Sequence, residues 1–139
     1  MQIDEESMRE SLERFVSFAS YPGEEAPAQS WLRGRLDELG FETYEWEPDT
    51  EILADHPSFP PPETLDLEDR PSVAGVLEFG NPDEGPTVVL NGHADVVPVE
   101  GEAWTSDPFE PRWEDGRLYA RGALDMKGGL TACIFAALA

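Results

Sequence analysis

Apolar residues in the first forty positions recur at helical spacing and predict two helices. Between residues 4 and 19 they fall at positions i, i+4, i+7, i+8 and i+11, which places them on one helical face. They are Met8, Leu12, Phe15, Val16 and Ala19. Asp4 suits the N-cap of this helix, because its carboxylate can accept a hydrogen bond from a free N–H of the first turn. The second predicted helix runs from Pro27 to Leu39, with Gly40 directly after its end.

Shorter patterns predict strands in the middle of the chain. Residues 41–47 alternate in polarity, with Tyr44 and Trp46 on one face, and residues 72–79 are rich in valine. Residues 87–90 (Thr-Val-Val-Leu) are almost continuously apolar, as is typical of a strand buried on both faces. The stretch 48–71 is rich in proline and acidic residues and predicts a long surface loop.

The last third of the chain combines a hairpin with a helix. Residues 113–119 predict a hairpin, because Asp115-Gly116 suits a type I′ turn, across which Glu114 can pair with Arg117. From about Lys127 the sequence becomes apolar and helical up to the last residue. Helices, strands and a further helix indicate an α/β layered fold. Because no capping or stop signal follows the apolar helix, we expect residues 1–139 to be an incomplete domain.

Charge is the unusual property of the composition. The 139 residues include 30 acidic and 9 basic side chains, which gives a net charge of −21, and Lys127 is the one lysine. Few lysines and many carboxylates favour a cytoplasmic protein of a salt-accumulating halophile, the alternative being an ordinary acidic protein. Nucleic-acid binding is disfavoured, because no basic patch exists to neutralise phosphates.

No signal peptide or membrane-spanning stretch is visible, so we expect a cytoplasmic protein without a membrane partner. Cys133 lies in an apolar run and is predicted to be a packed thiol.

The first candidate site follows the apolar stretch 87–90. His93 and Asp95 are two positions apart, so in extended chain both side chains project to the same side. Imidazole is a good zinc ligand, and a neighbouring carboxylate can hold its second ring nitrogen. A structural His–Asp hydrogen bond is the alternative. The other histidine, His56, lies between Asp55 and Pro57 and is predicted to be a solvated loop residue.

The second candidate site is Asp125, which lies between the hairpin and the last helix. Gly128 and Gly129 follow it, and small residues there allow close approach of backbone or ligand. Taken alone, Asp125 is better explained as the N-cap of the following helix than as a ligand.

Taken together, residues 93–129 resemble the metal-binding region of the M20 family of peptidases and deacylases. The resemblance rests on three motifs: H-A-D at 93–95, E-A-W-T-S-D-P-F-E-P at 102–111 and D-G-R-L-Y-A-R-G-A-L-D-M-K-G-G at 115–129. The family includes aminoacylases, carboxypeptidases, acetylornithine deacetylases and succinyl-diaminopimelate desuccinylases. The resemblance implies the N-terminal part of a three-layer α/β/α zinc-exopeptidase-like catalytic domain.

The resemblance also implies roles for single residues. His93 would be a ligand to one metal ion and Asp125 would bridge two, with zinc favoured over cobalt or manganese. Asp95, the remaining catalytic-site candidate, would hydrogen-bond His93. A cis peptide is expected between Asp125 and Met126. Trp104, Pro108 and Phe109 are expected to pack rather than react, and Lys127 to make a salt bridge or a surface contact.

The implied reaction is two-metal hydrolysis of an amide bond in N-acyl amino acids or short peptides. In the family the general base is a glutamate of a Glu-Glu pair downstream of the second motif, and no acidic residue follows Asp125 here. We therefore expect these residues alone to be inactive, with the metal site empty or weakly occupied.

The family's lid domain, through which the longer protein would form a homodimer, is also expected to lie outside these residues. The alternative is a non-catalytic binding module with a degenerate site. An acidic calcium-binding protein has little support, because no D-x-[DN]-x-[DN]-G loop is present.

Overall fold

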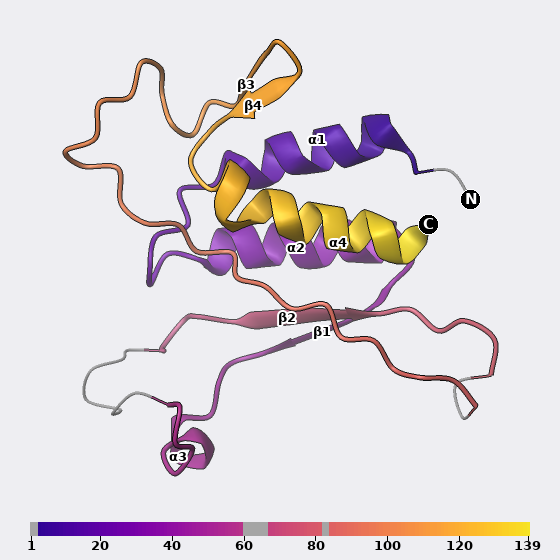
Figure 1. The fold of residues 1–139 in the computed structure, drawn as a ribbon. Coiled ribbons are helices and arrows are strands. Elements are labelled where there is room, and N and C mark those ends of the chain that lie inside the picture. Colours follow the sequence, from indigo (N-terminus) through magenta and orange to yellow (C-terminus); the bar gives the residue numbers. More distant parts are fainter. Residues whose placement is uncertain (1–2, 60–66, 82–83) are drawn as a thin grey trace.

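The computed structural model describes residues 3–59, 67–81 and 84–139. Three helices run side by side and lie on one face of a two-stranded sheet (Figure 1). They are α1 (Glu5–Val16), α2 (Ala26–Glu38) and α4 (Gly128–Leu138). The sheet pairs β1 (Glu42–Trp46) with β2 (Ser72–Val76) in antiparallel orientation, with Tyr44 opposite Ala74.

Helix α1 forms where the apolar spacing predicts it. The Asp4 carboxylate accepts a hydrogen bond from the Ser7 N–H at 3.0 Å, which confirms the predicted N-cap. The helix buries Phe15 and Val16. Helix α2 likewise buries Leu32 and Leu36. Gly40 follows it with φ +89°, a left-handed conformation that glycine adopts without steric cost.

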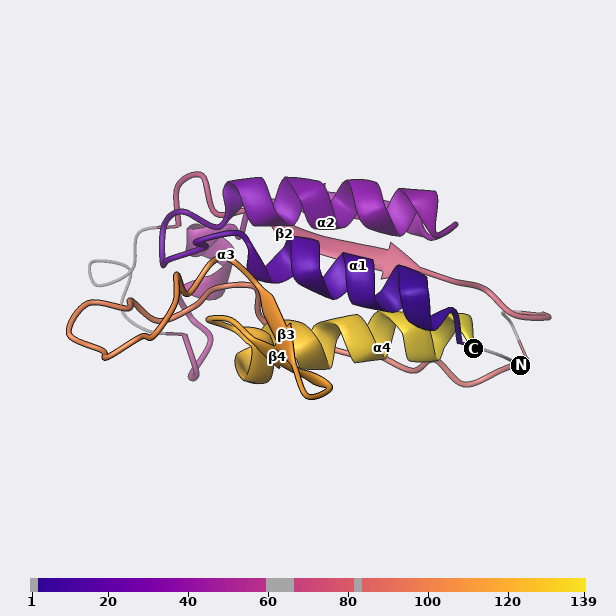
Figure 2. The ribbon, with the colours of Figure 1, turned by 90° about the horizontal axis from the view of Figure 1, so that it is seen from above.

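The core lies between the helices and the sheet. Viewed from above, α1 lies between α2 and α4 (Figure 2), and α2 contacts both β1 and β2. Fully buried members of the core are Phe15, Ala28, Leu32, Leu36 and Ala94. Trp31 packs its ring against those of Phe15 and Phe18, with centroids 5.5 and 5.8 Å apart.

The predicted hairpin is present as β3 (Arg112–Glu114) and β4 (Arg117–Tyr119). Asp115 and Gly116 both have positive φ, as a type I′ turn requires. Glu114 lies opposite Arg117 in the register, but its carboxylate pairs with Arg112 on its own strand instead. The Trp113 indole N–H donates to Glu13, and the Arg9 guanidinium lies 4.1 Å from the ring centroid, so the hairpin rests on α1.

The prediction of a buried strand at residues 87–90 is wrong for this structure. The segment has no strand hydrogen bonding, and Val88, Val89 and Leu90 are 75%, 80% and 52% exposed. A strand buried on both faces needs partner strands on both sides and a layer over each face. In the described part of the chain the sheets have two strands each, and neither includes these residues.

The α/β layering is therefore present in coarse form, with helices and small sheets, but the expected three-layer arrangement is not confirmed. The predicted loop 48–71 contains a short helix, α3 (Thr50–Leu53), capped by Asp49, and residues 60–66 of this loop lie outside the described residues. None of the described helices is long and apolar enough to cross a bilayer.

Candidate metal centre

The first site segment, residues 93–96, alternates in burial. Ala94 and Val96 are 4% and 2% exposed and face the interior. The side chains of His93 and Asp95 are 46% and 39% exposed on the opposite side. This is the period-two arrangement that the spacing predicts, and it presents an imidazole and a carboxylate together at the surface.

The second site segment, residues 122–127, enters a wide turn after the hairpin. The turn η2 (Ala123–Lys127) leaves helical geometry at Asp125 and Met126, and the peptide bond between them is cis, as expected. The Asp125 side chain is 84% exposed. Helix α4 begins at Gly128, and no side chain caps its N-terminus by a hydrogen bond, so the alternative of Asp125 as a helix cap is wrong.

The fold brings the two segments together at the His93 ring. Its Nε2 atom lies 3.1 Å from Oδ1 of Asp125, which is 32 residues away in the sequence. Its Nδ1 atom forms a hydrogen bond of 3.1 Å with the backbone carbonyl oxygen of Asp95 and also lies 3.1 Å from Oδ1 of the same residue. The three site candidates thus form one chain of contacts, Asp95–His93–Asp125, with the imidazole in the middle.

The donor types fit a zinc-like metal ion. Imidazole nitrogen and carboxylate oxygen are both zinc ligands, and Nε2 and Oδ1 face each other. The number of ligands is small, however. Among residues 3–59, 67–81 and 84–139, no group of three or more His, Cys, Asp or Glu side chains is placed to hold a metal ion. Two ligands are too few for the tight binding of a dinuclear site, so the roles of His93, Asp95 and Asp125 remain predictions.

Lys127 does not occupy the surface position that the sequence suggested. The residue is fully buried, its Nζ donates a hydrogen bond to the Phe18 carbonyl at 2.8 Å, and it lies 5.2 Å from the Phe15 ring centroid. Burial lowers the pKa of Lys127 to about 8, and the nearby charge of Asp95 acts in the opposite direction. The aliphatic part of the lysine side chain can pack in the apolar interior while its ammonium group reaches the carbonyl oxygen.

The aromatic residues before the hairpin pack, as expected. Phe109 makes an edge contact with Tyr21, with centroids 5.7 Å apart, and the Trp104 indole N–H donates to Glu102. Arg121 pairs with the same Glu102 carboxylate, and its hydrogen bond and charge hold the pKa of that carboxyl below its usual range. The Arg121 guanidinium also stands 5.2 Å from the Trp104 ring centroid. These contacts tie the loop before the hairpin to the start of the second site segment.

Sequence reasoning missed Ser20 and Gly122, which join the site segments to the core. Ser20 is 1% exposed and its hydroxyl donates to the Ala94 carbonyl at 2.6 Å. Gly122 has φ +80°, and an added Cβ there would lie 2.7 Å from Cγ1 of Val96. A glycine before the Asp125 motif was a visible signal, whereas nothing in the local pattern around Ser20 pointed to residues 94–96.

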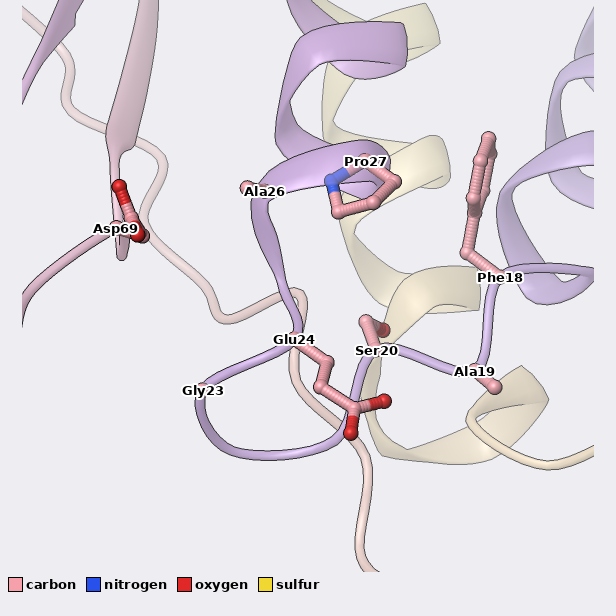
Figure 3. A pocket seen from close by; sticks show the side chains of 8 residues that line it. All are labelled: Phe18, Ala19, Ser20, Gly23, Glu24, Ala26, Pro27 and Asp69. Atoms are coloured by element: carbon pink, nitrogen blue, oxygen red, sulfur yellow. The ribbon is translucent and has the colours of Figure 1, made fainter.

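A hollow of about 380 Å³ lies between the loop after α1 and the start of α2 (Figure 3). It is lined by Phe18, Ala19 and Ser20 after α1 and by residues at the start of α2, with the carboxylates of Glu24 and Asp69 at its rim. None of the three site candidates lines it. The hollow is thus separate from the His93–Asp125 contact, and His56, which is exposed in its loop, lies outside its lining as well.

Comparison with known families supports the resemblance. Residues 89–139 match the model of peptidase family M20/M25/M40. This stretch contains both site segments, His93 to Val96 and Gly122 to Lys127.

Curated relatives extend the similarity over most of the chain. The N-formyl-4-amino-5-aminomethyl-2-methylpyrimidine deformylase of Bacillus subtilis (strain 168) is 34% identical over an alignment of 139 positions that covers 95% of this chain and 28% of the relative. The succinyl-diaminopimelate desuccinylase of Methylorubrum extorquens is 41% identical over 115 residues, or 82% of this chain and 25% of the relative. The chain thus spans about a quarter of the length of these relatives.

Proposed function

We propose that this chain, a member of peptidase family M20/M25/M40, supplies the first metal ligands of a longer enzyme that hydrolyses an amide bond in N-acyl amino acids or short peptides. His93 and Asp125 would hold divalent metal ions, zinc in the first place, and Asp95 would orient His93. Two relatives are named for removing a formyl or a succinyl group, which supports acyl-amide hydrolysis.

The observation that carries this proposal is the 3.1 Å separation between His93 Nε2 and Asp125 Oδ1. Zinc binds imidazole nitrogen and carboxylate oxygen at about 2.0–2.2 Å, so two ligands of one tetrahedral ion lie about 3.4 Å apart. The two atoms are at hydrogen-bond distance here, and a small widening of this pair would admit the ion. The side chains of His93 and Asp125 are 46% and 84% exposed, so both are accessible from solvent. An exposed, preformed N,O pair suits a site that a metal and a substrate can reach.

Asp95 completes this arrangement. An oxygen that accepts the Nδ1 proton fixes the tautomer of His93 and leaves the Nε2 lone pair free for a metal. Asp95 supplies that oxygen: its backbone carbonyl forms the hydrogen bond to Nδ1 at 3.1 Å, and its Oδ1 atom lies at the same distance. When bound, the metal supplies a water of lowered pKa and polarises the amide carbonyl. Within residues 1–139, His93 and Asp125 would hold the metal and Asp95 would orient the His93 ring. The general base would come from outside these residues.

A non-catalytic binding module is the second candidate function. It is favoured by the number of ligands, because no group of three or more suitable side chains is found among the described residues. In that case His93 and Asp125 would bind a metal weakly or not at all, and the longer protein would show no turnover.

The test is hydrolysis by the longer protein that contains these residues. With Zn²⁺, Co²⁺ or Mn²⁺ added, N-formyl and N-succinyl amines should be hydrolysed, and Asp125→Ala should lower turnover by more than about 100-fold, because loss of a ligand costs more than loss of an outer partner. Residues 1–139 alone should be inactive. His56→Ala removes the one other histidine, at an exposed loop position, and is the matched control.

Two results would contradict the proposal. One is metal-dependent turnover that survives both His93→Ala and Asp125→Ala. The other is a longer protein without turnover on any acyl amide, which would favour the binding module instead. Turnover by residues 1–139 that His93→Ala abolishes would keep the site but overturn the expected need for an outside general base.

A further inference from the structure

The short loop after α1, residues 18–20, contacts both site segments, and we call it the anchor loop. It touches the first segment at two points. The Ser20 hydroxyl donates to the Ala94 carbonyl at 2.6 Å, and the Ser20 carbonyl accepts from the Val96 N–H at 2.9 Å. These two bonds bracket Asp95 and fix the backbone on which His93 and Asp95 project outward.

The anchor loop holds the second segment through Lys127. The Phe18 carbonyl accepts a hydrogen bond from the Lys127 ammonium at 2.8 Å, and the residue has no exposed surface. Removing an ammonium group from water costs several kcal/mol, so a buried lysine needs compensating contacts. Here they are the Phe18 carbonyl and the face of Phe15, whose ring centroid is 5.2 Å away. Lys127 lies two residues after Asp125 and so ties the Asp125 turn to α1.

The two segments also touch each other directly at Gly122. A Cβ added there would lie 2.7 Å from Cγ1 of Val96 and 3.3 Å from Cδ of Lys127. The absence of a side chain therefore lets the Asp125 turn close against the His93 segment. The anchor loop, Val96 and Gly122 together leave little freedom to either backbone.

We propose that Ser20 and Lys127 are positioning residues that set the distance between His93 and Asp125. The anchor loop acts as a common reference: Ser20 holds the His93 segment to it and Lys127 holds the Asp125 segment to it. This inference rests on the proposed metal site and adds to it the source of its geometry. Neither residue touches a metal or a substrate, and both act through the backbone of the ligands.

The experiment uses the longer protein, with Co²⁺ as the probe. Ser20→Ala removes the hydroxyl that holds Ala94, and Lys127→Met removes the ammonium while keeping the length of the side chain. The matched control is Ser11→Ala, because Ser11 is also buried and its hydroxyl also donates to a carbonyl, that of Ser7 at 2.7 Å within α1. The Co²⁺ dissociation constant and the visible absorption spectrum of bound Co²⁺ are measured for each variant, together with the urea midpoint.

We expect Ser20→Ala and Lys127→Met each to raise the Co²⁺ dissociation constant about tenfold, the lower end of the range for residues that orient ligands. The visible spectrum should change in both, because the ligand geometry changes. Ser11→Ala should lower the urea midpoint without altering affinity or spectrum. Where Lys127→Met does not fold, Ser20→Ala alone decides.

A folded Ser20→Ala protein with the wild-type Co²⁺ affinity and spectrum would overturn the inference and leave the proposed function standing. Co²⁺ binding that is the same in wild type and in His93→Ala would overturn the proposed metal site and this inference together. The two failures are therefore distinguishable by the His93→Ala measurement.

Discussion

Two neighbouring stretches of one chain, residues 87–90 and residues 93–96, have opposite surroundings. The first is the more apolar, yet Val88 and Val89 are three-quarters or more exposed. The second carries a histidine and an aspartate, yet Ala94 and Val96 are almost fully buried. The difference lies in partners: residues 94–96 meet Ser20 and Gly122, whereas residues 87–90 take no part in either described sheet. Apolar character predicts a need for burial, and partners elsewhere in the chain decide whether the need is met.

The largest effect on stability should come from filling the close contact at Gly122. Gly122→Ala requires a left-handed conformation, which costs an L-residue roughly 1–2 kcal/mol, and places Cβ 2.7 Å from Val96. With about 1–3 kcal/mol more for overpacking, we expect a loss of about 3 kcal/mol in the free energy of unfolding, measured in urea.

Gly116→Ala is the control for this measurement. Gly116 has φ +76°, close to that of Gly122, but an added Cβ would meet nothing within 4 Å. It should cost only the conformational part, roughly 1–2 kcal/mol. Equal losses in the two variants would show that residues 93–96 and 122–127 are not closely packed against each other.

The exposed stretch gives a smaller effect. Val89→Ser should change the free energy of unfolding by less than about 0.5 kcal/mol, because Val89 is exposed. Urea unfolding of wild type and variant measures the difference, and a loss as large as that of Gly122→Ala would show that Val89 is packed after all.

The same contrast explains which parts of the structure the sequence could predict. Helices α1 and α2, the cap at Asp4 and the turn at Asp115-Gly116 depend on neighbours within a few residues, and all were predicted. The closeness of His93 to Asp125 was implied by the family resemblance and not by the pattern itself. The hydrogen bond from Ser20 to Ala94 spans 74 residues and that from Lys127 to Phe18 spans 109, so no local signal could specify them.

Two errors have the same origin. Lys127 was expected to make a salt bridge or a surface contact, whereas it is buried and its partner is a backbone carbonyl that the sequence does not mark. Glu114 was paired with Arg117 because the register places them opposite, but Arg112 on the same strand lies closer to its carboxylate. In both cases side-chain geometry, not residue type, selects the contact.

The smallest predicted effect is a shift in the pKa of Tyr44, which lies on β1 and is surrounded by carboxylates. Tyr44 is 47% exposed and its hydroxyl donates to Glu42 at 2.6 Å. This hydrogen bond, partial desolvation and the charges of Glu42 and Glu78 raise the pKa of the Tyr44 phenol above its ordinary value. Tyr44 should therefore form its phenolate at a higher pH than an isolated tyrosine, measured as the ultraviolet absorbance of wild type minus that of Tyr44→Phe.

A substitution and a change in salt concentration separate the effect of the hydrogen bond on the pKa of Tyr44 from the effect of the neighbouring charges. Glu42→Gln replaces the charged acceptor of the Tyr44 hydrogen bond by a neutral amide oxygen, which removes the charge and weakens the bond, so it should lower the pKa of Tyr44 toward its ordinary value. Raising KCl to about 1 M shortens the Debye length to about 3 Å, so it should weaken the effect of Glu78 more than the direct hydrogen bond. Glu45→Gln is the matched control, because it removes the same charge from the same strand at a residue that pairs with Arg33. If Glu45→Gln lowered the pKa of Tyr44 as much as Glu42→Gln, the general negative charge of this chain, and not the local hydrogen bond, would govern this pKa.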